Sequence, residues 1–228
     1  MLPDDAVIAR MQELIHHWET RSDPRAIFLR CYCMMTGNML EAVRRGEFND
    51  PTWVEQLLNH FAGYYFAALE DYQRAPAQAP TVWQVALDSD RCVRFTALQN
   101  LLLGVNAHIN YDLVFALVDL LRPEWTLLTE EQRAARYADH CRVNQVIGQT
   151  IDAVQDQVLV PVMSVVGLID RLLGPMDELL ISRIISGWRE TVWQNAVRLL
   201  ELQDENERLR FRQTVEEEAV QLGDIICG

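Results

Sequence analysis

A histidine and an aspartate four residues apart, His108 and Asp112, stand inside the most apolar stretch of the chain, residues 101–121. On a helix, residues at this spacing lie on the same face, so the two side chains can form a hydrogen bond. Such a pair can move a proton, because the carboxyl group orients the imidazole and stabilises its charged form. The pair therefore indicates acid/base chemistry; a hydrogen-bonded core pair is the alternative.

The stretch that holds the pair is apolar on every side of a helix, which is typical of a buried helix. A carboxylate buried there is costly unless other groups bind it, so Asp112 needs partners on other helices. Asn106 and Asn110 occupy the nearly opposite side of the same helix. They are expected to give oriented hydrogen bonds to a ligand or, alternatively, to bind the helix backbone.

Candidate partners lie on two later helices, on or beside the apolar face of each, and they are Asp139, His140, Asn144, Arg189 and Trp193. We expect Arg189 to be the counter-ion of Asp112 or Asp139, because charges about 4 Å apart attract by roughly 4 kcal/mol at an effective dielectric near 20. Binding of substrate by Arg189 is an equal alternative. His60, at the edge of an aromatic face, is a further binding candidate, with a hydrogen-bonded core histidine as the other interpretation.

The sequence excludes one kind of catalysis and lacks the motifs of several others. The chain has no lysine, which excludes Schiff-base catalysis. It has no Walker loop, no dinucleotide-binding glycine motif and no His-Glu-x-x-His, and it lacks the two Glu-x-x-His motifs of the di-iron bundles. We therefore expect no cofactor, although His108 and Asp112 with His140 or Asp139 could hold a divalent metal.

The composition limits the partners and the compartment. A net charge of -13 argues against nucleic acid and anionic membranes as partners. The five cysteines include no Cys-x-x-Cys pair and are expected to be reduced thiols. No basic segment followed by an apolar run opens the sequence, so we expect a cytoplasmic protein, with a homodimer as a possible assembly.

Helical periodicity throughout the chain predicts an all-α fold, a single domain over residues 1–228 with seven to eight helices around a buried central helix. Caps and prolines place helices near 4–20, 24–46, 51–74, 83–88, 91–122, 129–172, 176–202 and 205–222. Pro161 is expected to bend the sixth of these helices.

The sequence also resembles the bacterial domain-of-unknown-function family 5995. Its most specific match is Asn-Ala-His-Ile-Asn-x-Asp-Leu, residues 106–113. Looser matches are Phe28, Tyr32, Thr36, residues 46–48, Asp50, Phe61, Tyr65, Ala68, Leu69, residues 102–105, Asp139, Val143, Asn144, Arg189, Trp193 and Ala196. The resemblance implies a helical fold and a site at Asn106, His108, Asn110 and Asp112, but no reaction. His140 departs from the family pattern, where an aromatic residue is expected.

These observations favour an enzyme that acts on a small, largely apolar metabolite by acid/base chemistry, as a cyclase, an isomerase or a lyase. His108 is expected to be the acid or base, and Asp112 or Asp139 to set its tautomer. Asn106, Asn110, Asn144, Arg189, Trp193 and His60 are the candidate binding residues. The alternatives are a metal-dependent hydrolase that uses the same site and a non-enzymatic binding or interaction protein.

Overall fold

The computed structural model describes residues 4–88, 96–162 and 178–228, and every regular element in these ranges is a helix. The longer helices are α1 Asp4–Glu19, α2 Arg25–Arg44, α3 Pro51–Arg74, α4 Thr81–Leu87, α6 Ala97–Asn106, α7 Leu113–Leu121, α8 Glu130–Val154, α10 Glu178–Glu201 and α11 Glu205–Cys227. Short helical turns are η1 Pro76–Gln78, η2 Ala107–Asp112, η3 Gln155–Leu159 and η4 Val160–Val162. The predicted all-α fold is confirmed.

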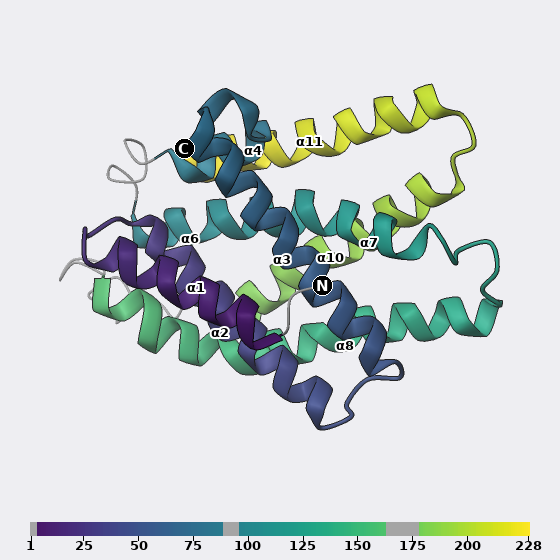
Figure 1. Cartoon of the computed structure of the whole chain (residues 1–228), viewed down its shortest axis with the longest axis horizontal. Coiled ribbons are helices and arrows are strands. Elements are labelled where there is room, and N and C mark those ends of the chain that lie inside the picture. The colour runs from purple at the N-terminus through teal and green to yellow at the C-terminus, as the bar shows by residue number, and fades with distance from the viewer. Residues whose placement is uncertain (1–3, 89–95, 163–177) are drawn as a thin grey trace.

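The run α6, η2 and α7 forms the centre of the bundle, as Figure 1 shows. Helices α3 and α10 pack against α7, while α2, α4 and α11 pack against α6. Residues 113–118 are all buried, so this part of the helix has no face for water. Residues 97–121 are long and apolar enough to cross a membrane, but 72% of their most apolar window is buried within the fold. The stretch is therefore accounted for as a core helix.

Side-chain caps begin several helices, and those at Asp50 and Thr129 were predicted from the sequence. The Asp50 side chain accepts from the backbone N–H of Trp53 at 3.0 Å and begins α3. Thr96 and Gln99 form a reciprocal capping box at the start of α6, and Thr129 with Gln132 does the same before α8. These bonds satisfy backbone donors that a helix end otherwise leaves unpaired.

The helix bounds differ from the prediction at two places within the described residues. The last helix continues to Cys227 rather than ending near Leu222. The α-helix from Glu130 ends at Val154, where a π turn and a 3-10 turn follow before and around Pro161, so the proline is accommodated by a change of winding. The expected start of the central helix near residue 91, the continuation of the later helix to residue 172, and Cys92 lie outside the described residues.

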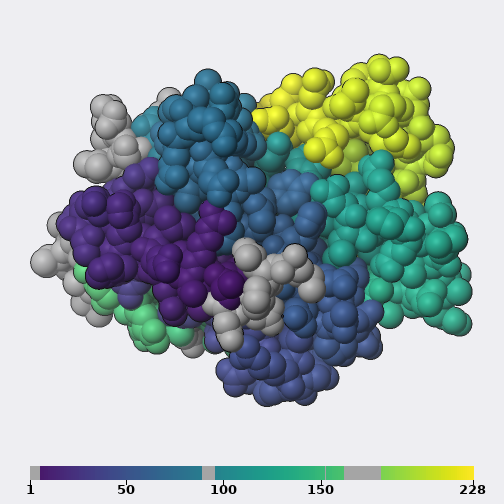
Figure 2. Space-filling model, viewed as in Figure 1, coloured from purple at the N-terminus to yellow at the C-terminus, as the bar shows by residue number. Residues whose placement is uncertain are grey.

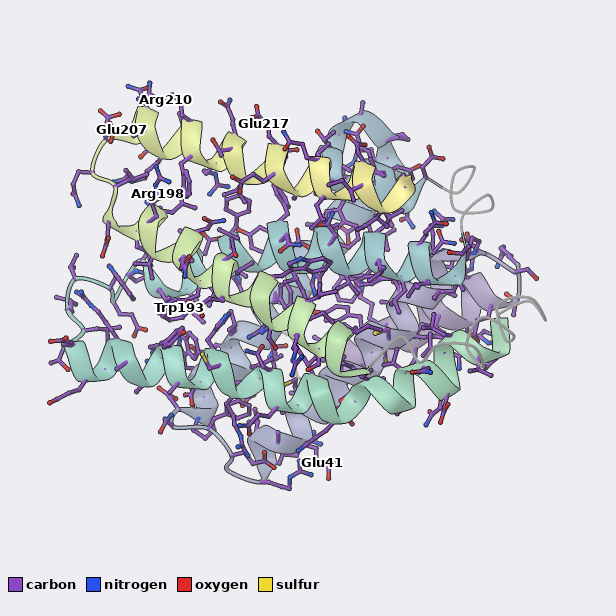
Figure 3. All side chains as sticks on the ribbon, turned by 180° about the vertical axis from the view of Figure 1, so that it is seen from behind. Glu41, Trp193, Arg198, Glu207, Arg210 and Glu217 are labelled. Atoms are coloured by element: carbon purple, nitrogen blue, oxygen red, sulfur yellow. The ribbon has the colours of Figure 1, made fainter. Side chains whose placement is uncertain are left out.

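The outer helices place charged side chains on the surface. Figure 2 shows α1 and α11 at the surface on one face of the molecule. Seen from behind in Figure 3, α10 passes between α8 and α11, and Glu207, Arg210 and Glu217 project outward from α11. The charged residues on the outward face of α11 agree with the amphipathic pattern of this helix.

Helix α6 lies close against α2 at Gly104. A Cβ atom added there would lie 2.7 Å from the Cβ of Phe28 and nearer still to its ring. The ring of Phe28 in turn lies at the edge of the His108 ring, with 5.9 Å between the centroids. The glycine therefore sets the position of an aromatic residue beside the histidine.

We predict that Gly104→Ala lowers the free energy of unfolding by about 1–3 kcal/mol, because the new methyl group must displace Phe28 in a packed core. The matched control is Gly37→Ala in α2, where an added Cβ meets nothing within 4 Å. There alanine should stabilise the helix by up to about 1 kcal/mol. Urea unfolding of both variants measures the difference, and equal effects would contradict the close approach at Gly104.

Candidate active site

His108 lies on a π-helical turn in the middle of the central helix. The backbone N–H of Leu113 donates to the carbonyl oxygen of His108, five residues earlier, rather than to the residue four earlier. The turn keeps His108 and Asp112 together, with Nδ1 of the imidazole 3.0 Å from Oδ2 of the carboxyl group. Turns of this kind occur often at functional sites because they re-aim side chains within a helix.

Asp112 has a second partner on α4. The indole Nε1–H of Trp83 donates to both carboxyl oxygens of Asp112, at 3.0 Å each. Only 1% of Asp112 and 3% of His108 is exposed. The sequence required a partner for this buried carboxyl, and the indole and the imidazole supply it.

Burial determines the protonation of the pair. It raises the pKa of Asp112 well above its usual value, an effect that the bond from Trp83 opposes in part. It lowers the pKa of His108 well below its usual value. The imidazole is therefore neutral at neutral pH, and a full ion pair between the two groups is disfavoured.

Aromatic rings enclose the imidazole. Phe61 stacks on it with 3.5 Å between centroids and 6° between planes, and Tyr32 meets it edge-on at 4.2 Å. Tyr65 and Trp83 lie within 6.2 Å, centroid to centroid. Nε2 of His108 is buried and forms no hydrogen bond with any residue that the structure describes. Its capacity to accept or donate a proton is thus unused.

A cavity of about 130 Å³ lies beside this histidine, between α2, α3, the central helix, α8 and α10. Its wall is mostly aliphatic and aromatic. The lining residues are Phe28, Cys31, Tyr32, Met35, Thr36, Met39, Trp53, Val54, Leu57, Leu58, Phe61, Val105, His108, Ile109, Leu113, Asp139, His140, Val143, Ile147, Ile185 and Arg189. The structure thus brings four predicted residues to one cavity, from three helical segments: His108, Asp139, His140 and Arg189.

Arg189 and His140 bind each other at one part of this wall. The Arg189 guanidinium donates from Nε to Oδ1 of Asn144 at 2.8 Å and from Nη2 to the carbonyl oxygen of His140 at 2.8 Å. Nε2 of His140 donates to the carbonyl oxygen of Arg189 at 2.9 Å, which leaves Nδ1 to accept from Nη2 at 3.3 Å. The expected ion pair of Arg189 with Asp112 or Asp139 is not formed.

Asp139 has a structural partner set instead of a contact with His108. Its two carboxyl oxygens accept from the backbone N–H and side-chain amide of Asn49, at 2.7 and 2.9 Å, and from the backbone N–H of Asp50 at 2.9 Å. These bonds fasten the turn between α2 and α3 to α8. The expectation that Asp139 sets the tautomer of His108 is not met; Asp112 occupies that position.

Three other candidates lie outside the cavity wall. The Asn106 amide donates to the carbonyl oxygen of Ala219 at 2.8 Å, and Asn110 donates to Oδ1 of Asn106 at 2.9 Å, so the two amides tie the central helix to α11. The ring of Trp193 packs 5.2 Å from that of His140. These residues support their neighbours and do not reach the cavity.

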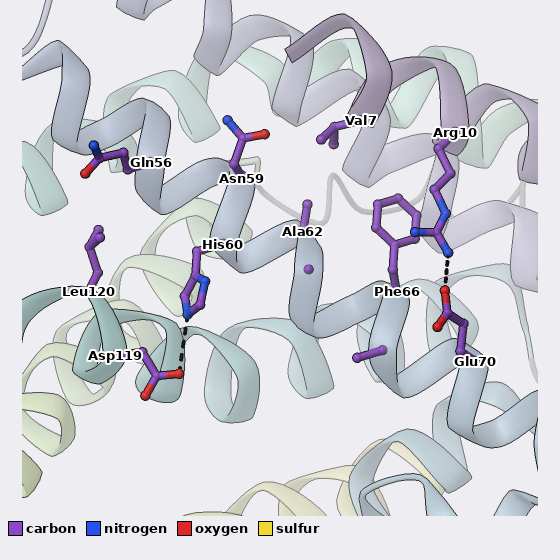
Figure 4. Close-up of a pocket in the computed structure, with 12 residues that line it drawn as sticks. Val7, Arg10, Gln56, Asn59, His60, Ala62, Phe66, Glu70, Asp119 and Leu120 are labelled. Carbon is purple, nitrogen blue, oxygen red and sulfur yellow. Dashed lines mark hydrogen bonds and ion pairs between the residues drawn. The ribbon is translucent and has the colours of Figure 1, made fainter. Parts of the chain in front are cut away.

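His60 lies in a different depression, a surface groove of about 660 Å³ along α3. There Nε2 of His60 lies 3.3 Å from Oδ2 of Asp119, as Figure 4 shows, and the hydroxyl of Tyr64 donates to the same oxygen at 2.5 Å. His60 is exposed, so it is neither a core histidine nor a neighbour of His108.

The geometry does not favour the metal site considered from the sequence. No group of three or more His, Cys, Asp or Glu side chains with the spacing of metal ligands occurs within 4–88, 96–162 and 178–228. Both ring nitrogens of His140 already have partners on Arg189. His140 is therefore a packing residue that orients the arginine.

The family model of DUF5995, a family of unknown function, matches residues 5–228. The chain belongs to this family. No curated protein and no solved structure matches the chain. Membership supports the resemblance noted from the sequence, and the site of this DUF5995 chain must be interpreted from its own geometry.

Sequence reasoning did not predict which aromatic residues surround His108. Phe61, Tyr32 and Trp83 look like ordinary core residues in the sequence, and nothing in their spacing indicates that they surround one histidine. Only Trp83 carries a usable signal, because a buried indole N–H needs an acceptor and Asp112 needs a donor.

Acidification should destabilise the protein through its buried histidines. Burial, and then the charge of Arg189, lowers the pKa of His140 well below its usual value. On acidification, His140 of the unfolded chain therefore binds a proton at a pH at which His140 of the folded protein is still neutral. Below about pH 6.5, stability is lost by up to about 1.4 kcal/mol per pH unit for this residue. Urea unfolding of wild type and His140→Gln between pH 7.5 and 5.5 should show a shallower loss in the variant. Parallel pH profiles would contradict a neutral His140.

Proposed function

We propose that the protein is an enzyme that transfers protons on a small, largely apolar molecule held in the central cavity, with His108 as general base. The observation that supports this most directly is the state of the His108 ring. Nδ1 is bound by Asp112, while Nε2 is buried, has no partner among the described residues, and belongs to a residue that lines the cavity. A base needs this combination of one oriented and one free nitrogen.

The side of the His108 ring that faces the cavity is part of this proposal. Asp112 and Trp83 bind the Nδ1 side of the imidazole, and neither residue lines the cavity. The opposite edge of the ring, which bears Nε2, is therefore the edge that we assign to the cavity. A molecule held there would meet Nε2 and the stacked ring of Phe61.

The volume and the wall limit the substrate. An apolar cavity of about 150 Å³ is sufficient to bind benzene. The present cavity, about 130 Å³ and mostly aliphatic and aromatic, fits a body of about six or seven heavy atoms. Large metabolites and highly charged ones do not match this site.

The proposed step moves one proton. A C–H bond of the substrate next to a carbonyl breaks, its proton goes to Nε2 of His108, and the electron pair passes to the carbonyl oxygen as an enolate. The step requires Asp112 in its ionised form, which the hydrogen bonds from Trp83 favour against the opposing effect of burial; the carboxylate then accepts Nδ1–H and compensates the charge of the imidazolium. Return of the proton to another carbon gives an isomer, and expulsion of a leaving group gives a lyase reaction.

A purely structural role for the pair is less well supported. A histidine that only packs would be expected to satisfy both ring nitrogens and to border no void. His140 does satisfy both, through Arg189, within the same wall. The contrast between the two histidines favours chemistry at His108.

Cyclohexanone, an apolar ketone of suitable size, tests the step. In deuterated water the wild-type protein should accelerate hydrogen–deuterium exchange at the carbons next to the carbonyl, as measured by NMR. His108→Gln should lower this rate by about 10²–10⁴-fold, the usual contribution of a general base.

The matched control is His60→Gln, which alters an exposed histidine in the surface groove and should leave the exchange rate unchanged. Exchange by His108→Gln at the wild-type rate would refute the role of His108. Binding of cyclohexanone without acceleration would favour a non-enzymatic binding protein, and failure of both cyclohexanone and benzene to bind would remove the basis of the proposal.

Asp112→Asn separates chemistry from stability. The amide oxygen can still accept from Trp83, but the amide N–H would donate to Nδ1 of His108 and move the ring proton to Nε2. We expect a stability equal to or above that of wild type, because a buried carboxyl is removed, together with an exchange rate lowered on the order of 10²-fold or more. Nitrogen-15 NMR of the imidazole reports the tautomer. An unchanged tautomer and full exchange would show that Asp112 does not orient His108.

A further inference from the structure

Arg189 is a buried cation without an anionic partner. It is 4% exposed, and burial lowers the pKa of its guanidinium to about 10. Its hydrogen bonds go to a neutral amide, a backbone carbonyl and a neutral imidazole, and it forms no ion pair within the described part of the chain. An unpaired buried charge is costly. A negatively charged ligand in the cavity would offset this cost by pairing with Arg189.

One end of the guanidinium is unused. Nε is bound to Asn144, and Nη2 is bound to His140 twice. No described residue accepts from Nη1, and Arg189 lines the cavity. The two bound nitrogens fix the plane of the guanidinium, so the free N–H groups have a defined direction before any ligand arrives.

A second donor on the wall is also unused. Nε1 of Trp53 is buried and forms no hydrogen bond with a described residue, and Trp53 lines the same cavity. Arginine and tryptophan side chains can donate but not accept. Asp139, the one carboxyl group among the described residues of the wall, has its oxygens bound by Asn49 and Asp50. The free N–H groups of Arg189 therefore call for an acceptor oxygen from the ligand.

We propose that the natural ligand is a small monocarboxylate, bound with its carboxylate on Nη1 of Arg189 and its apolar body in the cavity beside His108. This inference rests on the proposed function, because it uses the same cavity, and it names the substrate class. A single negative charge matches the single guanidinium. The mostly apolar wall leaves no place for a second charged group, which excludes dicarboxylates and phosphate esters.

A pair of isosteres tests the charge. Isovalerate and isovaleramide have the same branched body of seven heavy atoms and differ in charge. Isovalerate should bind the wild-type protein at least tenfold more tightly than isovaleramide, as measured by calorimetry or NMR titration. In Arg189→Met, which keeps the length of the side chain and removes its charge, the preference should disappear.

A spectroscopic measurement on the wild-type protein covers the case in which Arg189→Met does not fold. The guanidinium nitrogen-15 resonances of Arg189 should shift with isovalerate and not with isovaleramide. If isovaleramide and cyclohexanone bind as tightly as isovalerate, the monocarboxylate assignment is wrong, while the cavity and the role of His108 stand. If neither isostere, nor cyclohexanone, nor benzene binds, both this inference and the proposed function fail.

Discussion

The carboxyl group of Asp112 in the centre of the bundle is the constraint on which the site depends. Burial makes its charged form costly, so it can be present only where donors surround it. The indole of Trp83 and the imidazole of His108 are those donors, one from α4 and one from the same helix. The π turn between residues 107 and 112 and the aromatic rings around His108 hold the three groups in place. The need of the buried Asp112 carboxyl group for hydrogen-bond donors thus fixes the position of His108.

The bundle was predictable from the sequence because its signals are local. Proline and aspartate at helix starts, glycine at position 46, and apolar periodicity each act over a few residues, and Asp50 caps α3 as expected. The pairing of His108 with Asp112 was predictable for the same reason, since both lie on one helix. The π turn was not, because no residue pattern in the stretch distinguishes five-residue from four-residue hydrogen bonding.

The partners from other helices were predicted less well, because they depend on how helices rotate and cross. His140 was predicted on an inward face and Asp139 and Arg189 at the edges of such faces, and all three line the cavity. Which of them touch was not deducible. Electrostatic attraction alone favoured Arg189 beside a carboxylate, but Asp139 is bound by the turn before α3 and Asp112 by Trp83. Backbone and neutral donors had already satisfied both acids.

The separation of Arg189 from Asp112 has a chemical consequence for the proposed site. Had the two formed an ion pair, each charge would have been neutralised within the protein, and neither would act on a ligand. Instead neutral groups hold each of them: Asn144 and His140 the guanidinium, Trp83 and His108 the carboxyl. The cavity then has a cationic group, Arg189, on one part of its wall and the proposed base, His108, on another. An anionic ligand would balance the charge of Arg189, and the same contact would bring its apolar body to His108.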